Sequence, residues 1–187
     1  MNYTVFGIIG VIAVLVLWVV GIYNGFIKLR NRCDEAYSTM DVYLKKRYDL
    51  IPNIVETVKG YAKHEKETLD AVISARAKAV NAGSGSVEDR LDAERELNGV
   101  LGRLLAITES YPDLKANTNF MDLQDQLKGM EGEIASSRKF YNAVVKEYNI
   151  KVESVPSNII AGIFNFTKRP LFEVSSEVER ENVKVTF

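Results

Sequence analysis

The sequence predicts an all-α protein: an N-terminal transmembrane helix that continues into a long antiparallel four-helix bundle, then a short helix and an extended tail. Three observations support this fold class. The first 27 of the 187 residues carry no charged side chain, so all 49 Lys, Arg, Asp and Glu lie in the remaining 160. Beyond this run, apolar residues recur three or four positions apart, which is typical of helices. Only four prolines interrupt the chain.

The uncharged run fits one membrane crossing. Residues 5–22 are apolar throughout, and 18 to 20 helical residues span about 27–30 Å, the thickness of a bilayer's hydrocarbon core. A cleaved signal peptide would need a basic start and a shorter apolar core. A core helix of a soluble protein is rarely apolar on every face. We therefore expect a membrane anchor.

Basic residues give this anchor a direction. Lys28, Arg30 and Arg32 follow the crossing, whereas no basic residue precedes it. Because Lys and Arg beside a crossing tend to stay in the cytoplasm, the N-terminus should face outward and the C-terminal part should be cytoplasmic.

Composition narrows the function of the remaining chain. Its net charge of −1 leaves no broad basic face, which argues against binding nucleic acid. The single cysteine, Cys33, excludes an internal disulfide and fits a reducing compartment. Cys33 lies on the apolar stripe, so it should be a packed core thiol.

The helices are predicted in order from stripes and end signals. The first should run from Thr4 to about Tyr48. Asp49 is then a candidate N-cap, and Pro52 fits the first turn of a second helix that continues to about Val80. A loop follows over residues 81–86.

The second half of the chain has clearer signals. Ser86 and Asp89 resemble a capping box before a third helix that stops near Tyr111. A fourth helix should start at residues 117–119, and a short one, capped by Ser157 or Asn158, should reach Phe164. The division is thus an anchor at residues 1–27, a bundle at 28–170 and a tail at 171–187.

The fourth helix carries a long apolar stripe. Its tyrosines should fill core layers while their hydroxyls find polar partners. The stripe comprises Phe120, Leu123, Leu127, Met130, Ile134, Ser137, Tyr141, Val144, Tyr148 and Val152. In the tail, Val183, Val185 and Phe187 alternate with polar residues, which predicts an extended segment.

The residues predict no catalytic, cofactor-binding or metal-binding set and no small-molecule substrate. His64 is the only histidine, and Glu67 would share its helix face. Two ligands are fewer than a zinc site needs, so a solvated histidine is the favoured interpretation. A metal-dependent hydrolase using His64 is kept as the weakest functional hypothesis.

Two short motifs are candidate contact sites. Gly21 and Gly25 match the small-xxx-small pattern of helix pairs, which would mediate self-association at the membrane boundary. Lys45, Lys46 and Arg47 form a basic cluster. We interpret it as complementing the dipole at the C-terminus of the first helix, and alternatively as a patch for an acidic partner.

At this point the chain resembles the LemA family over nearly its whole length. The resemblance implies a bacterial membrane protein with one N-terminal anchor and a long antiparallel helical bundle, and it implies no enzyme. Some relatives occur in magnetosome gene clusters and others beside membrane proteases. Two positions depart from the pattern: Tyr37, where tryptophan is common, and Asn165, where glycine often follows the phenylalanine. The segments that carry the resemblance are residues 30–32 (RNR), 41–53 (DVYLKKRYDLIPN), 55–62 (VETVKGYA), 64–65 (HE), 75–76 (AR), 138–142 (RKFYN), 148–149 (YN) and 156–158 (PSN).

Together these features favour a scaffold or adaptor in the bacterial inner membrane. It would act through self-association and contacts with another membrane protein, with the lipid bilayer as its other partner. A membrane-linked sensor or signalling module is the alternative. It ranks lower because an outward tail of about four residues leaves little room for a ligand site.

Overall fold

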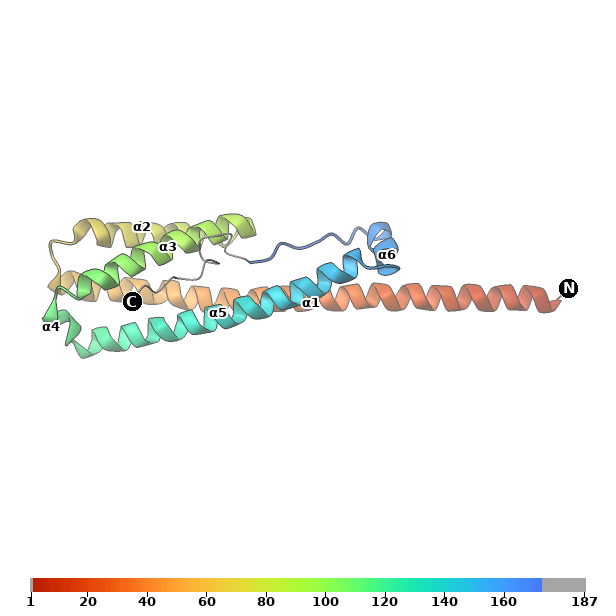
Figure 1. Cartoon of the computed structure of the whole chain (residues 1–187), viewed down its shortest axis with the longest axis horizontal. Coiled ribbons are helices and arrows are strands. Elements are labelled where there is room, and N and C mark those ends of the chain that lie inside the picture. The colour runs from red at the N-terminus through yellow and green to blue at the C-terminus, as the bar shows by residue number, and fades with distance from the viewer. Residues whose placement is uncertain (1, 173–187) are drawn as a thin grey trace, which may run out of the picture. The chain divides into compact units, whose positions relative to one another are not determined.

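A computed structural model describes residues 2–172 of the chain, which are all-α, as predicted (Figure 1). No strand occurs among these residues. The predicted extended segment with Val183, Val185 and Phe187 lies outside them. The helices are α1 (Asn2–Tyr61), α2 (Lys66–Ala82), α3 (Val87–Thr108), α4 (Pro112–Lys115), α5 (Thr118–Glu153) and α6 (Ser157–Ile163).

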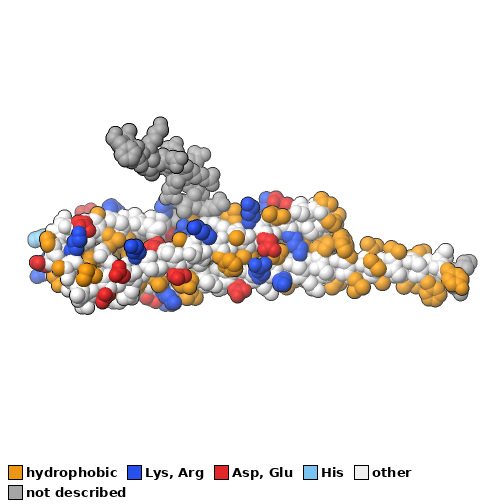
Figure 2. All heavy atoms as spheres, turned by 60° about the horizontal axis from the view of Figure 1, so that its bottom comes forward, with side chains coloured by type: hydrophobic (Ala, Val, Ile, Leu, Met, Phe, Trp, Pro, Cys, Tyr) orange, Lys and Arg blue, Asp and Glu red, His pale blue; other side chains and the backbone are white. Residues whose placement is uncertain are grey.

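The N-terminal part of α1 is long and apolar enough to cross a membrane. An 18-residue window in it has a mean hydropathy of 3.0, and none of that window is buried by the rest of the protein. Figure 2 shows this part covered by apolar side chains without a charge among them. The surface is therefore suited to lipid, as the sequence predicts.

The chain divides into two compact units. Within the described residues, the first comprises residues 2–47 and 127–171, and the second comprises residues 48–126 with Phe172. Each unit contains part of α1 and part of α5. Both helices therefore continue from one unit into the other. The predicted division separates the anchor from the bundle at residue 27 and the bundle from the tail at residue 170, and it stays a prediction.

In the first unit, α1 and α5 pack antiparallel. The ring of Phe26 lies 6.2 Å from that of Tyr148, and farther along α1 the ring of Tyr37 lies 5.7 Å from that of Tyr141. Residue numbers rise along α1 as they fall along α5, which is the antiparallel arrangement expected from the sequence. Tyr37, which departs from the tryptophan of the LemA pattern, thus still packs an aromatic ring against Tyr141. The buried apolar side chains between the helices include Cys33, Ala36, Met40, Leu44, Ile134, Val144 and Val145.

Cys33 is the packed core thiol that its position predicts. Its side chain is buried, and this burial raises the pKa of the thiol above its ordinary value. The nearby Arg169 guanidinium acts in the opposite direction but does not reverse the shift. Cys33 should therefore carry little reactive thiolate at neutral pH.

Tyr141 confirms the prediction for the core tyrosines. Its ring is buried, and its hydroxyl donates to the carbonyl oxygen of Pro170 at 3.0 Å. Burial raises the pKa of this phenol to about 12. The hydroxyl therefore remains protonated at neutral pH and holds the segment that follows α6 against α5.

Asn149 makes a second link to the same segment. Its amide nitrogen donates to the carbonyl oxygen of Arg169 at 2.8 Å, and its amide oxygen accepts from the backbone N–H of Arg169 at 2.9 Å. The guanidinium of Arg169 reaches Asp34 of α1 at 2.6 Å. One amide side chain thus satisfies both backbone groups of an irregular residue, and that residue ties the segment to α1.

The start of α6 differs from the prediction. Neither Ser157 nor Asn158 caps α6, because the N-cap position is Pro156. The Ser157 hydroxyl instead donates to carbonyl oxygens of Lys151 and Ser154, where α5 ends.

Asn165 has φ = 56°, a left-handed conformation that glycine and asparagine tolerate best. Asparagine can therefore replace the glycine at this position.

In the second unit, α2 and α3 form an antiparallel pair joined by a short loop (Figure 1). The predicted capping box is present: the Ser86 hydroxyl accepts from the Asp89 N–H, and the Asp89 carboxylate accepts from the Ser86 N–H. Lys78 and Glu96 connect the two helices at 2.7 Å. α3 ends at Thr108, three residues before the expected stop, and the short α4 follows. The core includes Ile51, Ile54, Val58, Val72, Ala75, Leu97, Leu101 and Leu104.

The predicted helix boundary at Asp49 is wrong. α1 continues through Pro52 to Tyr61, and the chain turns only at residues 62–65. Proline has no N–H, so the carbonyl oxygen of Tyr48 loses its helical partner four residues on. Arg76 of α2 supplies a replacement, because its Nε donates to that oxygen at 2.7 Å. A side chain from the next helix therefore allows α1 to pass a proline without ending.

Candidate functional site

A groove in the second unit is the strongest candidate for a binding site. It lies where the last turns of α1 meet the first turns of α2, and its volume is about 540 Å³. This volume falls within the range of ordinary ligand and side-chain pockets, about 300–1,000 Å³. The groove is lined by Val55, Glu56, Lys59, Lys63, Lys66, Leu69, Asp70 and Ile73.

The floor of the groove is apolar. Val55 and Leu69 are 3% and 6% exposed, whereas Ile73 is 50% exposed. The stripes of α1 and α2 therefore bury two of these side chains in the core and leave the third accessible. An exposed isoleucine beside an apolar floor is a surface on which a partner's apolar side chain can be buried.

The rim of the groove is rich in lysine. Lys59 pairs with Glu56 one helical turn away at 3.2 Å. Lys63 and Lys66 are exposed and form no ion pair within residues 2–172. With Asp70 included, three lysines and two carboxylates give the lining a net charge of +1. The two lysines without ion pairs make the groove more suited to an acidic ligand than to a basic one.

Hydrogen bonds from the α3–α5 connection hold the turn beside the groove. The Tyr111 hydroxyl donates to Glu65 at 3.0 Å, and this bond to a carboxylate raises the pKa of the tyrosine. The Asn117 amide donates to the Tyr61 hydroxyl at 2.9 Å. These two side-chain bonds flank the turn that carries Lys63.

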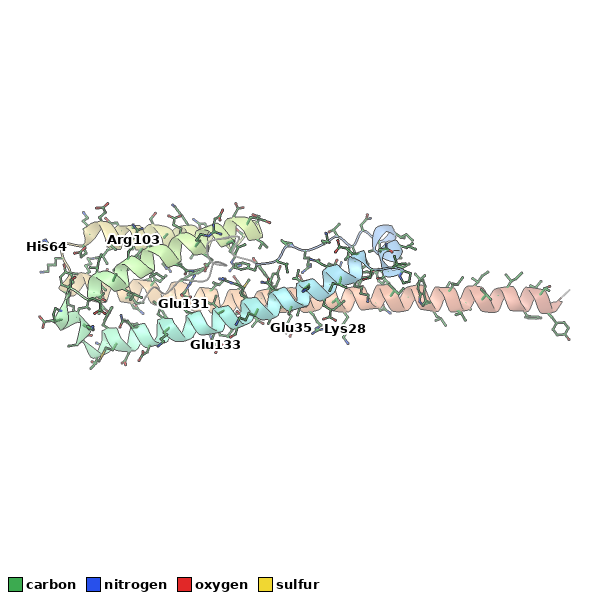
Figure 3. All side chains as sticks on the ribbon, viewed as in Figure 1. Lys28, Glu35, His64, Arg103, Glu131 and Glu133 are labelled. Atoms are coloured by element: carbon green, nitrogen blue, oxygen red, sulfur yellow. The ribbon has the colours of Figure 1, made fainter. Side chains whose placement is uncertain are left out.

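His64 occupies this turn, outside any helix. Figure 3 shows it beside the connection between α1 and α2, and its side chain is exposed. The expectation that His64 and Glu67 share a helix face is wrong, because α2 begins only at Lys66. Among residues 2–172, no group of three or more His, Cys, Asp or Glu side chains is arranged to hold a metal ion. The exposed position of His64 is what a solvated histidine would show.

The basic cluster at residues 45–47 is not an exposed three-residue patch. The interpretation that it ends a helix is wrong, since α1 continues beyond it to Tyr61. Arg47 is 1% exposed and bonds to Glu131 of α5 at 2.7 Å. Lys46 lies over the ring of Tyr43 at 5.4 Å, and Lys45 is exposed. A buried arginine of this kind joins α1 to α5 and is unavailable to an acidic partner.

The two glycines predicted to mediate helix contact differ from each other. A Cβ added to Gly25 would meet the Nζ of Lys151, so this close approach is used within the chain. A Cβ added to Gly21 would meet nothing within 4 Å. Of the pair, only Gly21 therefore has its backbone open toward the surroundings, and self-association through it stays a prediction.

The three basic residues after the span are largely at the surface. Lys28 and Arg30 are exposed, and the Arg30 guanidinium lies 5.8 Å from the centre of the Phe166 ring. Arg32 pairs with Glu147 at 3.3 Å, with both side chains partly exposed. All three lie outside the apolar stretch of residues 5–22.

The groove was not predicted from the sequence. Its three lysines are spaced four and three positions apart, at residues 59, 63 and 66, which was the available signal. Because the sequence predicts a helix from about Asp49 to Val80, all three lysines fall within one predicted helix. The site arises only when the chain turns between them.

Comparisons with known proteins agree with the resemblance seen in the sequence. Protein LemA of Metamycoplasma hominis is 25% identical over 164 residues, which cover 88% of this chain and 74% of that protein. Magnetosome protein MamQ 2 of Paramagnetospirillum magneticum is 25% identical over 175 residues, covering 81% of this chain and 64% of the relative. Magnetosome protein MamQ of Magnetospirillum gryphiswaldense is 25% identical over 174 residues, with 80% and 64% covered. The chain thus spans slightly less than two thirds of the length of these magnetosome proteins.

The family comparison covers most of the bundle. The sequence profile described as LemA family matches residues 36–187, which include all of α2 to α6 and the groove. The chain therefore belongs to the LemA family.

Proposed function

We propose that this protein is a scaffold or adaptor anchored in the bacterial inner membrane, and that its groove binds an acidic, amphipathic segment of another membrane protein. The observation that carries the proposal is the combination of an apolar floor with two lysines that have no ion pair in the described chain. The proposal assigns the protein no catalytic role.

The chemistry of the groove selects the class of partner. Apolar side chains of a partner helix can bury against Val55, Leu69 and Ile73, as in other cases where a helix binds a groove. Carboxylates on the adjacent face of that helix would meet Lys63 and Lys66. A volume of about 540 Å³ accommodates a few side chains rather than a folded domain.

Self-association is the other part of the proposal. None of the 18-residue apolar window of α1 is buried by the rest of the described chain, and a Cβ added to Gly21 would meet nothing within 4 Å. Small residues allow helix backbones to approach closely in lipid. We therefore place a contact between two copies of the chain at this level of α1.

Photo-crosslinking from the groove in native membranes tests the binding proposal. A benzophenone amino acid at Ile73, which is 50% exposed, should give a specific adduct with another membrane protein. Replacing Lys63 and Lys66 by glutamate should reduce the yield at least several-fold, since like charges would then face the acidic segment.

Lys128→Glu with Lys139→Glu is the matched control. Both lysines are exposed on α5 and lie outside the groove, so this pair changes the net charge equally and should leave the adduct unchanged. Equal losses in the two double variants would contradict the proposal. Recovery of only uncrosslinked monomer when the benzophenone is at residue 73 and both groove lysines are intact would also contradict it.

We further propose that the N-terminus faces outward and the bundle faces the cytoplasm, because basic residues flank only one end of the span. A membrane-impermeant maleimide applied to intact cells should label Tyr3→Cys and leave Phe140→Cys unlabelled. The native Cys33 should add little background, since it is buried and the pKa of its thiol is raised. Labelling of Phe140→Cys alone would reverse the assigned orientation.

A further inference from the structure

The end of the first unit exposes a cluster of large apolar side chains around α6. Val155 is 79% exposed, Ile159 60%, Ile163 65% and Phe164 46%. Ile159 and Ile163 are four residues apart and so share one face of the short helix. Ile160 and Ala161, on the opposite side, are buried. An apolar cluster of this kind in a protein surface marks a contact with another molecule or a membrane.

Aromatic contacts fix where this cluster lies along α1. The ring of Tyr23 is 4.8 Å from that of Phe164 and 5.6 Å from that of Phe166. The ring of Phe26 stacks on that of Phe166 at 4.7 Å. Tyr23 directly follows the apolar stretch of residues 5–22, so α6 lies beside α1 where the span ends, as Figure 1 shows.

Positive charges lie at the same level or just beyond it. The Lys151 ammonium lies 5.0 Å from the centre of the Phe26 ring, and the Arg30 guanidinium lies over Phe166. Lys28 is exposed one to two turns after Tyr23. Along α1, the apolar side chains come first and the cations follow within a few ångströms. Acyl chains and anionic headgroups have the same order at a bilayer surface.

We propose that α6 is a second membrane contact, which lies in the interfacial layer of the bilayer with Ile159, Ile163 and Phe164 among the acyl chains. Lipid is the occupant that fits, because the exposed face of α6 continues the apolar surface of the span, while the neighbouring cations fit headgroups. The proposal requires that α1 crosses the bilayer. It does not depend on which way the span is oriented, nor on what binds the groove.

Collision accessibility of spin labels in the full-length protein tests this placement. In a Cys33→Ala background, a label at Ile163→Cys would be measured in vesicles of phosphatidylcholine and phosphatidylglycerol. Oxygen concentrates in lipid, whereas the nickel complex used as the second collision partner stays in water. The ratio of oxygen collisions to nickel collisions should therefore be several-fold higher at residue 163 than at a control site. Ile159→Cys should behave in the same way and serves as an independent site if either variant folds poorly.

Phe140→Cys is the matched control. Phe140 is also apolar and 51% exposed, and it lies on α5 next to Tyr141, whose ring faces Tyr37. Tyr37 is 14 residues beyond Tyr23, or about 21 Å farther along α1. Equal oxygen-to-nickel ratios at residues 163, 159 and 140 would overturn the proposal. Strong dipolar broadening between labels at residue 163 of two copies, without a raised ratio, would also overturn it and would assign the face to a second copy of the chain.

Discussion

Replacing Arg76 by alanine should lower the free energy of unfolding of the protein by about 1.5–3 kcal/mol, the usual contribution of a hydrogen bond to a charged donor. Pro52 has no N–H to donate to the carbonyl oxygen of Tyr48, and Arg76 donates to that oxygen at 2.7 Å. Without the guanidinium, a largely buried oxygen would lose this hydrogen bond. Urea unfolding of the full chain in detergent, followed by far-ultraviolet circular dichroism, measures the loss. Fluorescence is unsuitable, since the single tryptophan, Trp18, lies in the span.

A double-mutant cycle with Pro52→Ala isolates the cause. An alanine at position 52 restores an N–H that can bond to the Tyr48 carbonyl, so Arg76→Ala should cost at least about 1 kcal/mol less in that background. Arg103→Ala is the control, because this arginine of α3 is exposed and its replacement should change stability by less than about 0.5 kcal/mol. Equal costs of Arg76→Ala in the two backgrounds would show that Arg76 does not compensate for the proline.

Replacing Asn149 by leucine should release the backbone of Arg169 from α5. The variant keeps a similar side-chain size but removes both hydrogen bonds to the backbone of Arg169, for a combined loss of about 2–3 kcal/mol. The Arg169 amide is the sharpest probe, since its hydrogen-bond acceptor is the Asn149 side chain. The Arg169 amide should therefore lose nearly all its protection against hydrogen exchange in the variant, while amides within α5 keep their protection.

Lys146→Leu provides the comparison for that result. Lys146 is exposed on the same helix, and the change also replaces a polar side chain with leucine. Protection of the Arg169 amide should be unaffected. If Asn149→Leu leaves that amide protected, the segment is held mainly by Tyr141 and the Arg169–Asp34 ion pair.

Features set by local sequence were predictable. The Ser86–Asp89 capping box and the long stripe of α5 were predicted correctly because both depend on spacing within one helix. Cys33 and Tyr141 were placed in the core for the same reason: a residue on the stripe is buried against whichever helix packs there.

Features that depend on a distant partner were not predictable. Pro52 carries a strong local signal for a helix start, and only Arg76, 24 residues later, reverses its effect. One signal was available in the sequence: buried residues at positions 44, 48, 51, 55 and 58 keep the same phase through the proline. The groove, the Asn149 link and the burial of Arg47 each require knowing which residues of a second element lie opposite.

The boundaries of the two units have a thermodynamic consequence. One boundary, after Arg47, falls inside α1, and the other, before Leu127, falls inside α5, so neither coincides with a loop. Melting one unit alone would leave two frayed helix ends in the other, each with carbonyl or N–H groups deprived of partners. Helix propagation is cooperative, which penalises such half-melted states. The two units should therefore unfold in a single transition.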